Sequence, residues 1–310
     1  MKDDRFRALF AEGLFEGEVR FMEPMRDYTS LRIGGSAEIF ALPKDLDSLR
    51  VIRLNLKKGN IPCIALGSGT NVLIRDGGIE GAVVLLRSLK KIEVLREENE
   101  FVYIHADAGA VLSRLVRFSQ EHGYSGLEGL AGIPGTVGGA ICGNSGAFGY
   151  EIRDVLVSLE MMDREGIASR RRSDEIAFGY RTSGIKSDEF ILGAEICLKK
   201  DHAEAVSQRI GEFLRTKRER QPIWEPSAGC VFKNPPGTSA GKLLDEAGCK
   251  GAKIGEVEVS EVHANFFVNR GNANASDFLK LMELVALRVE KRFGILLEPE
   301  IKILGKEIAD

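Results

Sequence analysis

A glycine-saturated segment at residues 126–149 (GLEGLAGIPGTVGGAICGNSGAFG) constrains this chain more than any other feature of its sequence. Glycine loses more backbone entropy on folding than any other residue, so a packed helix or strand does not collect nine of them without a reason. A shorter loop of the same kind, Leu66-Gly67-Ser68-Gly69-Thr70-Asn71, follows an apolar run. We therefore expect the backbone at both loops to lie against one large ligand that carries phosphate.

Both glycine loops suit anion binding, because backbone N–H groups without a neighbouring Cβ can approach phosphate oxygens closely. The GSGTN loop is not a Walker loop, since no Gly-Lys-Ser/Thr follows it, and it lacks the GxGxxG spacing of a dinucleotide-binding turn. For this short loop, a tight structural turn is an equally good interpretation. For the long segment, that alternative is much weaker.

Composition and charge exclude several other classes of protein. The chain has 310 residues, a length that predicts about two domains. Its hydrophobic fraction of 44% and charged fraction of 29% are those of an ordinary soluble globular protein. The net charge of -3 provides no basic footprint for nucleic acid. The arginine cluster at residues 170–172 is followed closely by acidic residues, so we predict a solvated turn there.

The cysteines indicate the redox environment. There are five of them, at positions 63, 142, 197, 230 and 249, and they form no CxxC pair. That pattern argues against a disulfide framework and a zinc site, and it favours a reducing compartment. The first residues, MKDDRFRALF, lack the apolar stretch of a signal peptide, and no segment has the length of a membrane span. We expect a cytoplasmic protein with no metal ion, membrane partner or nucleic acid.

Apolar periodicity and turn residues predict a mixed α+β chain rather than a regular βαβ repeat. The first part has predicted helices at 45–58 and 111–122, strands at 61–66, 72–74, 82–86, 155–162 and 190–199, and a hairpin of strands 91–95 and 101–107 around the turn Glu97-Glu98-Asn99. The second part has predicted helices at 206–218, 240–247 and 276–293, and strands at 257–260, 266–269 and 295–304. The pattern changes near residue 201, which predicts one domain at residues 1–201, with its core at 28–200, and another at 202–310.

Several motifs resemble one known family. LGSGTNVLIRDGG and the glycine segment resemble the flavin-binding domain of the UDP-N-acetylenolpyruvoylglucosamine reductase (MurB) family of bacterial peptidoglycan synthesis. The blocks FGYRTSGIK, SAGCVFKNP, AGKLLDEAGCKG, VSEVHANFFVN and LEPEIKILG resemble successive blocks of that family, in the same order. The resemblance runs from near Tyr28 to the last predicted strand, and such ordered coverage is highly specific.

The resemblance implies a two-step hydride transfer. NADPH would reduce bound FAD, and the reduced flavin would reduce UDP-N-acetylglucosamine enolpyruvate to UDP-N-acetylmuramate. It also implies a monomer with an FAD-binding domain of the vanillyl-alcohol oxidase (PCMH) type, followed by a smaller α+β substrate-binding domain. Some members of the wider flavin superfamily attach FAD through histidine, but the resemblance puts no attachment residue at His105. FAD is therefore expected to bind non-covalently.

Two other functions stay open. One is a flavin oxidase of the same superfamily that acts on another substrate, against which the SAGCVFKNP and LEPEI blocks argue. The other is a catalytically silent nucleotide-binding module.

No tyrosine-bearing insertion is found between Glu195 and the Cys230 block, which suggests the shorter, second type of this reductase with a more open site.

Three residues match the family's catalytic positions. Arg181 is a permanent, forked cation suited to a substrate carboxylate, although most arginines are surface or ion-paired residues. Cys230 stands where many members have a serine that protonates the enol carbon, and a thiol, with a reference pKa of about 8.5, releases a proton more readily than an alcohol. A small core cysteine is the alternative. Glu300 would polarise the substrate carboxylate or support the proton donor, while a solvent-facing glutamate is an equally good interpretation.

The resemblance also implies two sets of binding residues. Those for FAD are Leu66, Gly67, Ser68, Gly69, Thr70, Asn71, Gly132, Ile133, Pro134, Gly135, Thr136, Gly138, Gly139, Ala140, Asn144, Gly146 and Ala147, with residues 132–140 as the cradle of the pyrophosphate. Those for the substrate are Arg181, Lys233, Asn234 and Glu300. His263 has no acidic or cysteine partner at ligand spacing, so we expect it to be structural.

Overall fold

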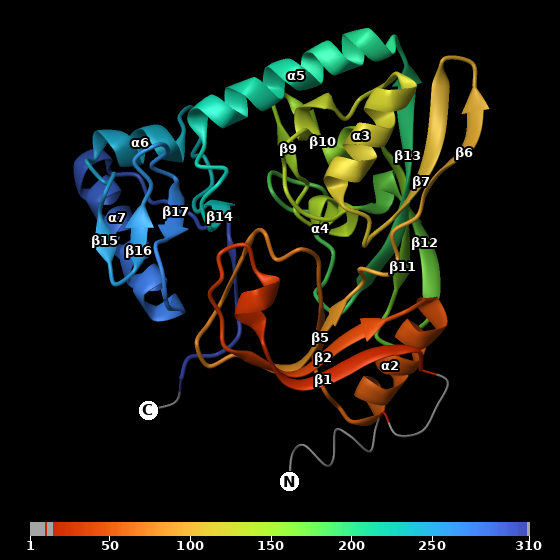
Figure 1. The fold of residues 1–310 in the computed structure, drawn as a ribbon, viewed down its shortest axis with the longest axis horizontal. Helices are drawn as coiled ribbons and strands as arrows, with labels where there is room; N and C mark the ends of the chain where they lie inside the picture. Colours follow the sequence, from red (N-terminus) through yellow and green to blue (C-terminus); the bar gives the residue numbers. More distant parts are fainter. Residues whose placement is uncertain (1–9, 11–14, 309–310) are drawn as a thin grey trace. The chain divides into compact units, whose positions relative to one another are not determined.

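The computed structural model describes residue 10 and residues 15–308, which divide into two compact units (Figure 1). The first unit comprises Met1–Phe21, Ile39–Ser68 and Gly81–Thr216, and the second comprises Met22–Glu38, Gly69–Glu80 and Lys217–Asp310. Both units are discontinuous in sequence, whereas the domain boundary that we predicted near residue 201 is a single point. The division into a cofactor domain and a substrate domain at that point stays a prediction.

The first unit contains most of a four-stranded sheet with the strand order β1-β2-β5-β3. Its strands are β1 (Gly17–Pro24), β2 (Ser36–Pro43), β3 (Cys63–Leu66) and β5 (Ile79–Leu85), and β3 is parallel to β5. Helix α2 (Leu46–Lys58) begins after Asp45, whose side chain accepts a hydrogen bond from the Ser48 N–H at 2.8 Å, and it ends at Gly59. The predicted helix at residues 45–58 is confirmed, whereas β1 and β2 were not predicted.

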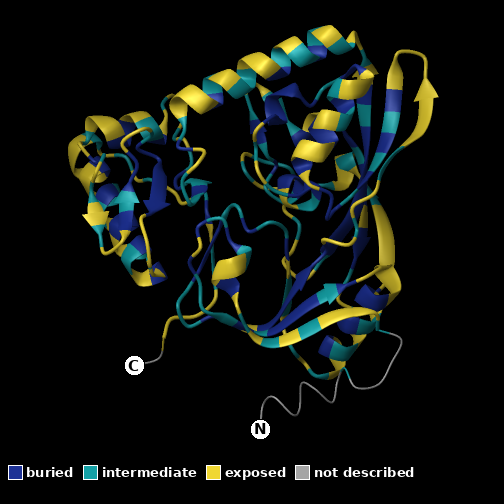
Figure 2. Ribbon diagram, in the orientation of Figure 1, coloured by how far each residue is buried: buried dark blue, intermediate teal, exposed yellow. Residues whose placement is uncertain are grey.

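A second sheet of the first unit supports the glycine segment. Its strands are β6 (Ile92–Glu98), β7 (Phe101–Asp107), β8 (Tyr124–Ser125), β11 (Leu156–Met162), β12 (Ala168–Arg172) and β13 (Phe190–Lys200), in the order β12-β11-β13-β7-β6 with β8 beside β13. Helix α4 (Val137–Cys142) contacts β7, β13 and helix α3 (Leu112–His122). Ile104, Ile196 and Ile141 are buried in the core of this unit. Figure 2 shows β13 largely in the colour of buried residues. The short elements are η2 (Glu128–Leu130), β9 (Gly146–Ala147), β10 (Tyr150–Glu151), η3 (Ile152–Asp154) and η4 (Ser173–Glu175).

Two details of this sheet differ from the sequence prediction. Residues 170–172 are largely exposed, as predicted, but they are not a turn: they belong to the edge strand β12, which pairs with β11. Arg170 forms an ion pair with Glu195, and Arg171 forms one with Glu189. The predicted hairpin of β6 and β7 is confirmed, but its ladder continues through Glu98. The turn therefore consists of Asn99 and Glu100, one residue later than the Glu97-Glu98-Asn99 turn that we expected, with which it shares Asn99.

The second unit is built on a four-stranded antiparallel sheet. The strands are β14 (Ser227–Cys230), β15 (Lys253–Ile254), β16 (Val257–Val259) and β17 (Phe266–Asn269), in the order β14-β17-β16-β15. Helix α7 (Ala275–Phe293) contacts β15, β16 and helix α6 (Ala240–Glu246). The rings of Phe267 and Phe278 pack with their centroids 5.3 Å apart in the buried core of this unit. The unit also contains η1 (Met25–Tyr28) and the parallel pair β4 (Val72–Ile74) and β18 (Lys302–Leu304).

The closing strand is much shorter than predicted. We expected a strand over residues 295–304, but β18 begins only at Lys302. Pro299 lacks a backbone N–H and forms only an isolated bridge with Phe232. The alternation of apolar and polar residues from 295 onward is therefore a property of an irregular segment, not of a ladder.

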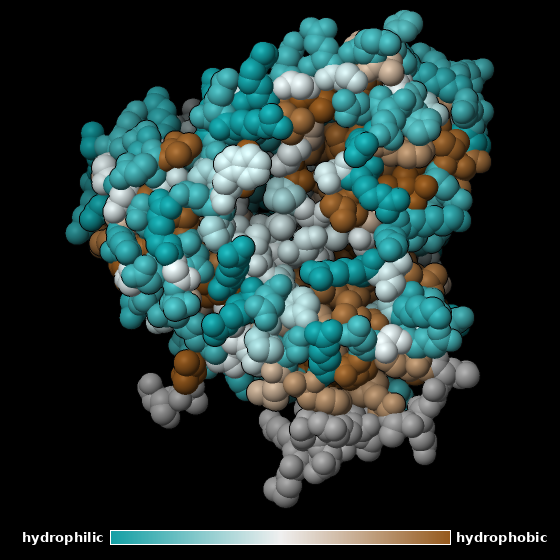
Figure 3. Space-filling model, in the orientation of Figure 1, coloured by the Kyte–Doolittle hydropathy of each residue, from teal (hydrophilic) through white to brown (hydrophobic). Residues whose placement is uncertain are grey.

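Helix α5 (Ala203–Arg220) runs from the last residues of the first unit into the first residues of the second. It is longer at both ends than the predicted helix at 206–218. Its surface in Figure 3 is mainly hydrophilic, as expected for a helix rich in charged residues. Among the residues that the structure describes, no helix combines the length and the apolar character needed to cross a membrane.

The cap of α2 can be tested directly. Asp45→Ala removes the acceptor of the Ser48 N–H, so we expect the unfolding midpoint in denaturant to fall at neutral pH, as the loss of a helix cap causes. The hydrogen bond from the Ser48 backbone holds the pKa of the Asp45 carboxyl below its usual value. The stabilisation is therefore complete above the unfolded-state pKa of about 3.9 and is lost as the pH falls through the lower folded-state pKa. Denaturant unfolding at neutral and acid pH measures both effects.

Asp45→Asn is the matched control for this cap. Asparagine caps a helix as well as aspartate does, but its side chain does not titrate. The Asn variant should therefore keep the neutral-pH stability without the additional loss in acid. Equal unfolding free energies for the Ala variant and the original chain at neutral pH would contradict the capping role.

Candidate functional site

The two glycine loops meet within the first unit. The short loop begins where β3 ends, at the buried residue Leu66. A Cβ atom at Gly67 would lie 2.6 Å from the Oγ1 atom of Thr136, in the long segment. Ser68 and Thr70 are half-buried. The bare backbone at Gly67 therefore allows two loops that are far apart in sequence to touch, as a shared ligand requires.

The second half of the short loop belongs to the second unit and leads to the predicted catalytic glutamate. Gly69 has a φ of +63°, and a Cβ atom there would lie 2.0 Å from the Tyr28 carbonyl oxygen. The Ser30 N–H donates a hydrogen bond to the Gly69 carbonyl oxygen at 3.1 Å. The Asn71 amide donates one to the Glu300 carbonyl oxygen at 3.3 Å. A predicted cofactor loop and a predicted catalytic residue are thus directly connected.

Residues 132–140, the predicted phosphate cradle, combine a turn with the short helix α4. Thr136 caps this helix by accepting a hydrogen bond from the Gly139 N–H at 3.2 Å. A Cβ atom at Gly138 would lie 2.9 Å from the Cβ of Ala108, so packing within the chain requires glycine there. At Gly139 a Cβ atom would meet only the Thr136 Oγ1 atom, at 3.4 Å. Because packing does not require a bare backbone at Gly139, close approach of a phosphate group accounts for it better.

The rest of the cradle follows a defined path. Gly132 has a φ of +74°, which favours glycine at this position. The Ile133 N–H donates a hydrogen bond to the Leu130 carbonyl oxygen at 3.0 Å, and the carbonyl oxygen of Gly135 accepts one from the Leu112 N–H at 3.0 Å. Pro134, like Gly132 and Gly139, is exposed, whereas Ala140 is buried. The exposed residues therefore lie between residues that are held by burial or by backbone hydrogen bonds, and a ligand can reach the backbone of the exposed ones.

Some glycines of the long segment are explained by the chain itself. A Cβ atom at Gly129 would lie 2.4 Å from the Ala147 carbonyl oxygen, and one at Gly146 would lie 2.2 Å from the Tyr150 carbonyl oxygen. Gly129 lets η2 pack against the β9–β10 hairpin, and Gly146 lets β9 approach β10 closely. Not every glycine of the segment therefore needs a ligand.

Asn144 connects the glycine segment to the turn that carries Arg181. Its side chain is fully buried, and its backbone has a φ of +41°. The amide nitrogen donates hydrogen bonds to the Gly179 carbonyl oxygen and to the Glu151 carboxylate, both at 3.0 Å. The amide oxygen accepts one from the Arg153 N–H at 3.4 Å. Both donor hydrogens of the amide are therefore used by contacts within the chain.

Arg181 lies at the tip of a tight turn. The N–H and the carbonyl oxygen of Gly179 bond to those of Thr182, and Arg181 has a φ of +59°, a conformation that a side chain other than glycine adopts rarely. Ser183, which follows Thr182, is buried and donates a hydrogen bond to the Cys142 carbonyl oxygen at 3.0 Å. Such strain at a single position is common where a side chain must be aimed at a ligand.

Cys230 lies at the end of β14, next to a bulge. Ser227 pairs with Val268 and Cys230 pairs with Phe266, so β14 has one residue more than β17 between these pairs. Gly229 has a φ of +75°, which accommodates the extra residue. Bulges of this kind change the direction of a side chain next to functional sites. The Cys230 side chain is half-buried.

The structure brings Glu300 next to Cys230. The Glu300 N–H donates a hydrogen bond to the carbonyl oxygen of Val231, the residue after Cys230, at 2.8 Å. Glu300 is half-buried, whereas the adjacent Ile301 is buried. Both residues belong to the second unit, and Arg181 belongs to the first.

The two further substrate candidates have partners within the second unit. The Lys233 ammonium group lies 3.2 Å from the Glu298 carboxylate, and the Lys233 N–H donates to the Glu298 carbonyl oxygen at 2.9 Å. The Asn234 side-chain oxygen accepts a hydrogen bond from the Ala240 N–H at 3.0 Å, at the start of α6. A substrate contact from Lys233 would therefore compete with an exposed ion pair, which costs little to break.

Sequence reasoning missed two polar residues. Lys217 is 7% exposed, and burial lowers the pKa of its amine to about 8. It continues the apolar stripe of Val206 and Ile210 on α5, and a lysine on such a stripe is a signal that could have been noticed. Asn265 is also buried and bonds both the N–H and the carbonyl oxygen of Phe232, which fixes the segment after Cys230.

Other features of the second unit contain no predicted catalytic residue. A hollow lined by Arg26, Arg32, Asp76 and Lys280 contains none of the predicted site residues. The Nδ1 atom of His263 accepts a hydrogen bond from a backbone N–H at 3.1 Å, and burial lowers the pKa of its ring. Within the described part of the chain, no group of three or more His, Cys, Asp or Glu side chains could hold a metal ion.

Two family models match different parts of the chain. Residues 37–170 match the family model described as an FAD binding domain, and residues 221–304 match the C-terminal domain of UDP-N-acetylenolpyruvoylglucosamine reductase. The predicted α+β fold with an FAD-binding domain is confirmed. The chain is a flavoprotein oxidoreductase that uses FAD.

Whole-chain relatives identify its family. The UDP-N-acetylenolpyruvoylglucosamine reductase of Geotalea uraniireducens is 40% identical over 305 residues, which are 98% of this chain and 99% of the relative. That of Caldanaerobacter subterraneus is 41% identical over 96% of this chain and 97% of the relative. The crystal structure of the Thermus caldophilus enzyme (MurB) is 32% identical, with a TM-score of 0.79 over 94% of this chain and all of that one. The chain belongs to the UDP-N-acetylenolpyruvoylglucosamine reductase family.

Proposed function

We propose that this chain reduces UDP-N-acetylglucosamine enolpyruvate to UDP-N-acetylmuramate in peptidoglycan precursor synthesis, with NADPH as the reductant. FAD, when bound, accepts hydride from NADPH and delivers it to the enolpyruvyl group. One observation carries the proposal: a glycine-rich segment in an FAD-binding domain and a reductase C-terminal domain, in which a backbone hydrogen bond joins Glu300 to the residue after Cys230, occur in one chain. The alternative flavin oxidase is not favoured, because it does not account for the C-terminal match.

Arg181 binds the substrate carboxylate. A guanidinium group is always charged and presents a fork that matches a carboxylate. Negative charge builds up next to that carboxylate as hydride reaches the alkene, so a fixed cation there stabilises the transition state. The strained turn and its link to Asn144 support this role, because they hold the arginine in one direction.

Cys230 donates the proton that completes the reduction, and Glu300 supports it. The bulge at Gly229 and the hydrogen bond from Glu300 to Val231 place the thiol and the carboxylate on adjacent segments. Many members of the family have serine at the position of Cys230. A thiol fills the same space and is the stronger acid, so it can serve as the donor. Lys233 and Asn234 contact the UDP-sugar or the phosphate of NADPH.

FAD binds non-covalently between the GSGTN loop and residues 132–140. The close contact of Gly67 with Thr136 and the open backbone at Gly139 support this assignment. The proposal includes the division into a cofactor domain at residues 1–201 and a substrate domain at 202–310. It also includes a monomer in the cytoplasm, with no nucleic-acid or membrane partner.

An anaerobic half-reaction assay tests the proposed reaction. The purified protein should be yellow, and its flavin absorbance should be bleached by NADPH. Addition of UDP-N-acetylglucosamine enolpyruvate should restore that absorbance, because the substrate reoxidises the flavin. Bleaching without reoxidation by the enolpyruvyl substrate would exclude this reductase activity and favour the oxidase alternative.

The proton donor can be separated from the rest of the site. Cys230→Ala should slow reoxidation by substrate by about 10²–10⁴-fold, the usual contribution of a general acid, and leave flavin reduction by NADPH almost unchanged. Cys230→Ser is the matched control and should keep much of the activity, since a hydroxyl group can also donate. Equal losses in both half-reactions for the Ala variant would mean that the thiol is structural.

The FAD cradle can be tested at Gly139. Gly139→Ala meets only one side-chain atom of the chain, so the apoprotein should keep its melting temperature. A methyl group on exposed backbone should hinder the phosphate and weaken FAD binding about tenfold or more, as the loss of one charge-assisted hydrogen bond would. Gly211→Ala on α5 is the matched control, since nothing lies within 4 Å of that position. Equal FAD affinities for the two variants would refute the cradle assignment.

A further inference from the structure

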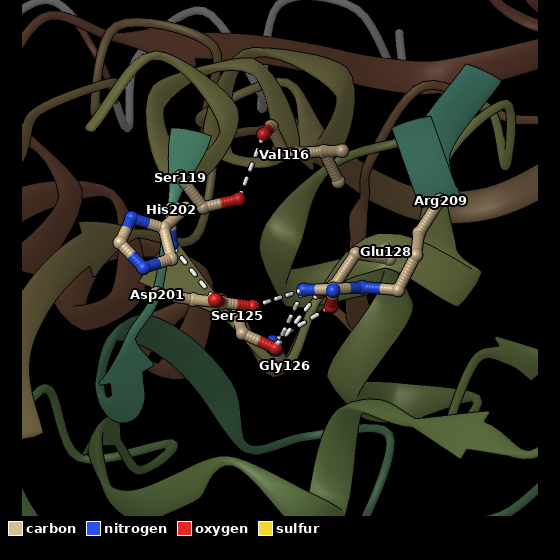
Figure 4. A network of polar contacts seen from close by, with 8 residues as sticks. All are labelled: Val116, Ser119, Ser125, Gly126, Glu128, Asp201, His202 and Arg209. Atoms are coloured by element: carbon tan, nitrogen blue, oxygen red, sulfur yellow. Dashed lines mark hydrogen bonds and ion pairs between the residues drawn. The ribbon is translucent and has the colours of Figure 1, made fainter. Parts of the chain in front are cut away.

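A buried carboxylate anchors the beginning of the glycine segment. The Glu128 side chain is not exposed at all, and it lies in η2, directly before the predicted cradle. It accepts hydrogen bonds from the Ser125 hydroxyl at 2.8 Å and from the Gly126 N–H at 2.7 Å. It also accepts two from the Arg209 guanidinium, at 2.7 and 3.0 Å (Figure 4). The carboxylate therefore has four donors and no need of water.

Arg209 connects this carboxylate to helix α5. Its guanidinium also forms an ion pair with Asp201 at 2.6 Å and donates to the Ser125 hydroxyl at 3.3 Å. The Asp201 N–H in turn donates to the Gly123 carbonyl oxygen at 2.7 Å. Figure 4 shows the Arg209 side chain pointing toward Glu128, with Asp201 and Ser125 beside its guanidinium group. The Arg209 guanidinium therefore holds both Ser125 and Glu128, at the beginning of the glycine segment, and Asp201, just before α5.

Electrostatics favour the ionised pair. Burial alone would raise the pKa of the Glu128 carboxyl, but the hydrogen bonds from Gly126 and Arg209 outweigh burial and lower it. The hydrogen bonds of Asp201 and Glu128 raise the pKa of Arg209. Breaking such a pair from one side leaves a buried charge without compensation, which is costly.

The path from Glu128 to the cradle is short and rigid. The Glu128 carbonyl oxygen accepts a hydrogen bond from the Ala131 N–H at 3.1 Å. In the next turn, the Ile133 N–H donates a hydrogen bond to the Leu130 carbonyl oxygen. Gly129, beside Glu128, packs against the Ala147 carbonyl oxygen with no room for a Cβ atom. A shift of the carboxylate would therefore be transmitted to residues 129–133.

Helix α5 also holds the other end of the glycine segment. Phe213, one turn after Arg209, stacks on Phe148 with ring centroids 4.4 Å apart and an angle of 8° between the planes. It also meets the Tyr150 ring edge-on at 5.9 Å. One face of α5 thus contacts both ends of the segment that contains the cradle.

We propose that Glu128 is a positioning residue for the flavin cofactor. By joining Ser125, Gly126 and Arg209, its carboxylate keeps residues 129–140 in the conformation that binds FAD. The proposal rests on the assignment of the cradle made under the proposed function. A purely structural role is the alternative, and it predicts lower stability without a specific effect on FAD.

The test compares two buried glutamates of the same unit in the full-length protein. Glu128→Gln keeps the size of the side chain but removes its charge, and it should weaken FAD binding about tenfold or more. Glu195→Gln is the matched control, because Glu195 is only 6% exposed and pairs with Arg96 and Arg170 on the large sheet. The control should lose melting temperature to a similar extent but keep its FAD affinity within about twofold.

FAD affinity is measured by titrating apoprotein with FAD and following flavin fluorescence, and the visible spectrum of the bound flavin provides a second readout. If Glu128→Gln folds poorly, Arg209→Lys replaces it, since this variant keeps the charge but loses the fork. It should weaken FAD binding in the same direction. Unchanged FAD affinity in the Glu128 variant, or an equal loss in the Glu195 variant, overturns the positioning role.

Gly139→Ala separates this proposal from the cradle assignment. Weaker FAD binding in both the Gly139 and Glu128 variants supports both. Weaker binding in the Gly139 variant alone supports the cradle and overturns the role of Glu128. Weaker binding in the Glu128 variant alone overturns the cradle assignment while it supports a link between Glu128 and the flavin.

Discussion

The close approach of one backbone to another within residues 126–149 is the constraint on which the rest of the first unit depends. Gly129 packs on the Ala147 carbonyl oxygen, Gly138 on Ala108, and Gly146 on the Tyr150 carbonyl oxygen, each at a distance that excludes a Cβ atom. Backbone that is packed this tightly has few alternative paths. A loop that contains so many glycines would otherwise be flexible, and here it is a rigid scaffold.

The functional side chains of the first unit are attached to this scaffold. Asn144, buried and in a left-handed conformation, bonds the turn that carries Arg181, and Glu128 bonds the helix that carries Arg209. The proposed catalytic cation, Arg181, and the proposed FAD cradle are therefore both supported by the glycine segment. A common support matters for catalysis, because even a small displacement of a group that positions a substrate lowers the reaction rate greatly.

In the second unit, backbone contacts position Cys230, the proposed proton donor. Cys230 ends a strand whose register is shifted by one residue at Gly229, and Glu300 is held beside it by a backbone hydrogen bond to Val231. The buried Asn265 fixes the following residue, Phe232, through both of its backbone groups. Because backbone contacts do most of this work, serine and cysteine can exchange at position 230 without a change of scaffold.

The sequence by itself determined the elements whose signals are local, and it identified the family through its ordered motifs. Helix α2 has its cap and its apolar stripe within its own residues, and α7 likewise begins at the Asn274 cap and ends at Gly294. Only the tertiary structure decided that residues 170–172 form an edge strand, since they pair with β11, and Glu195 and Glu189 form ion pairs with Arg170 and Arg171 from distant positions. It also decided which glycines serve packing and which leave backbone open to a ligand, and it revealed the partner of Glu128. Capping and periodicity act within a turn or two of chain, whereas a buried charge, a strand register and a missing Cβ are explained by atoms that only folding brings near.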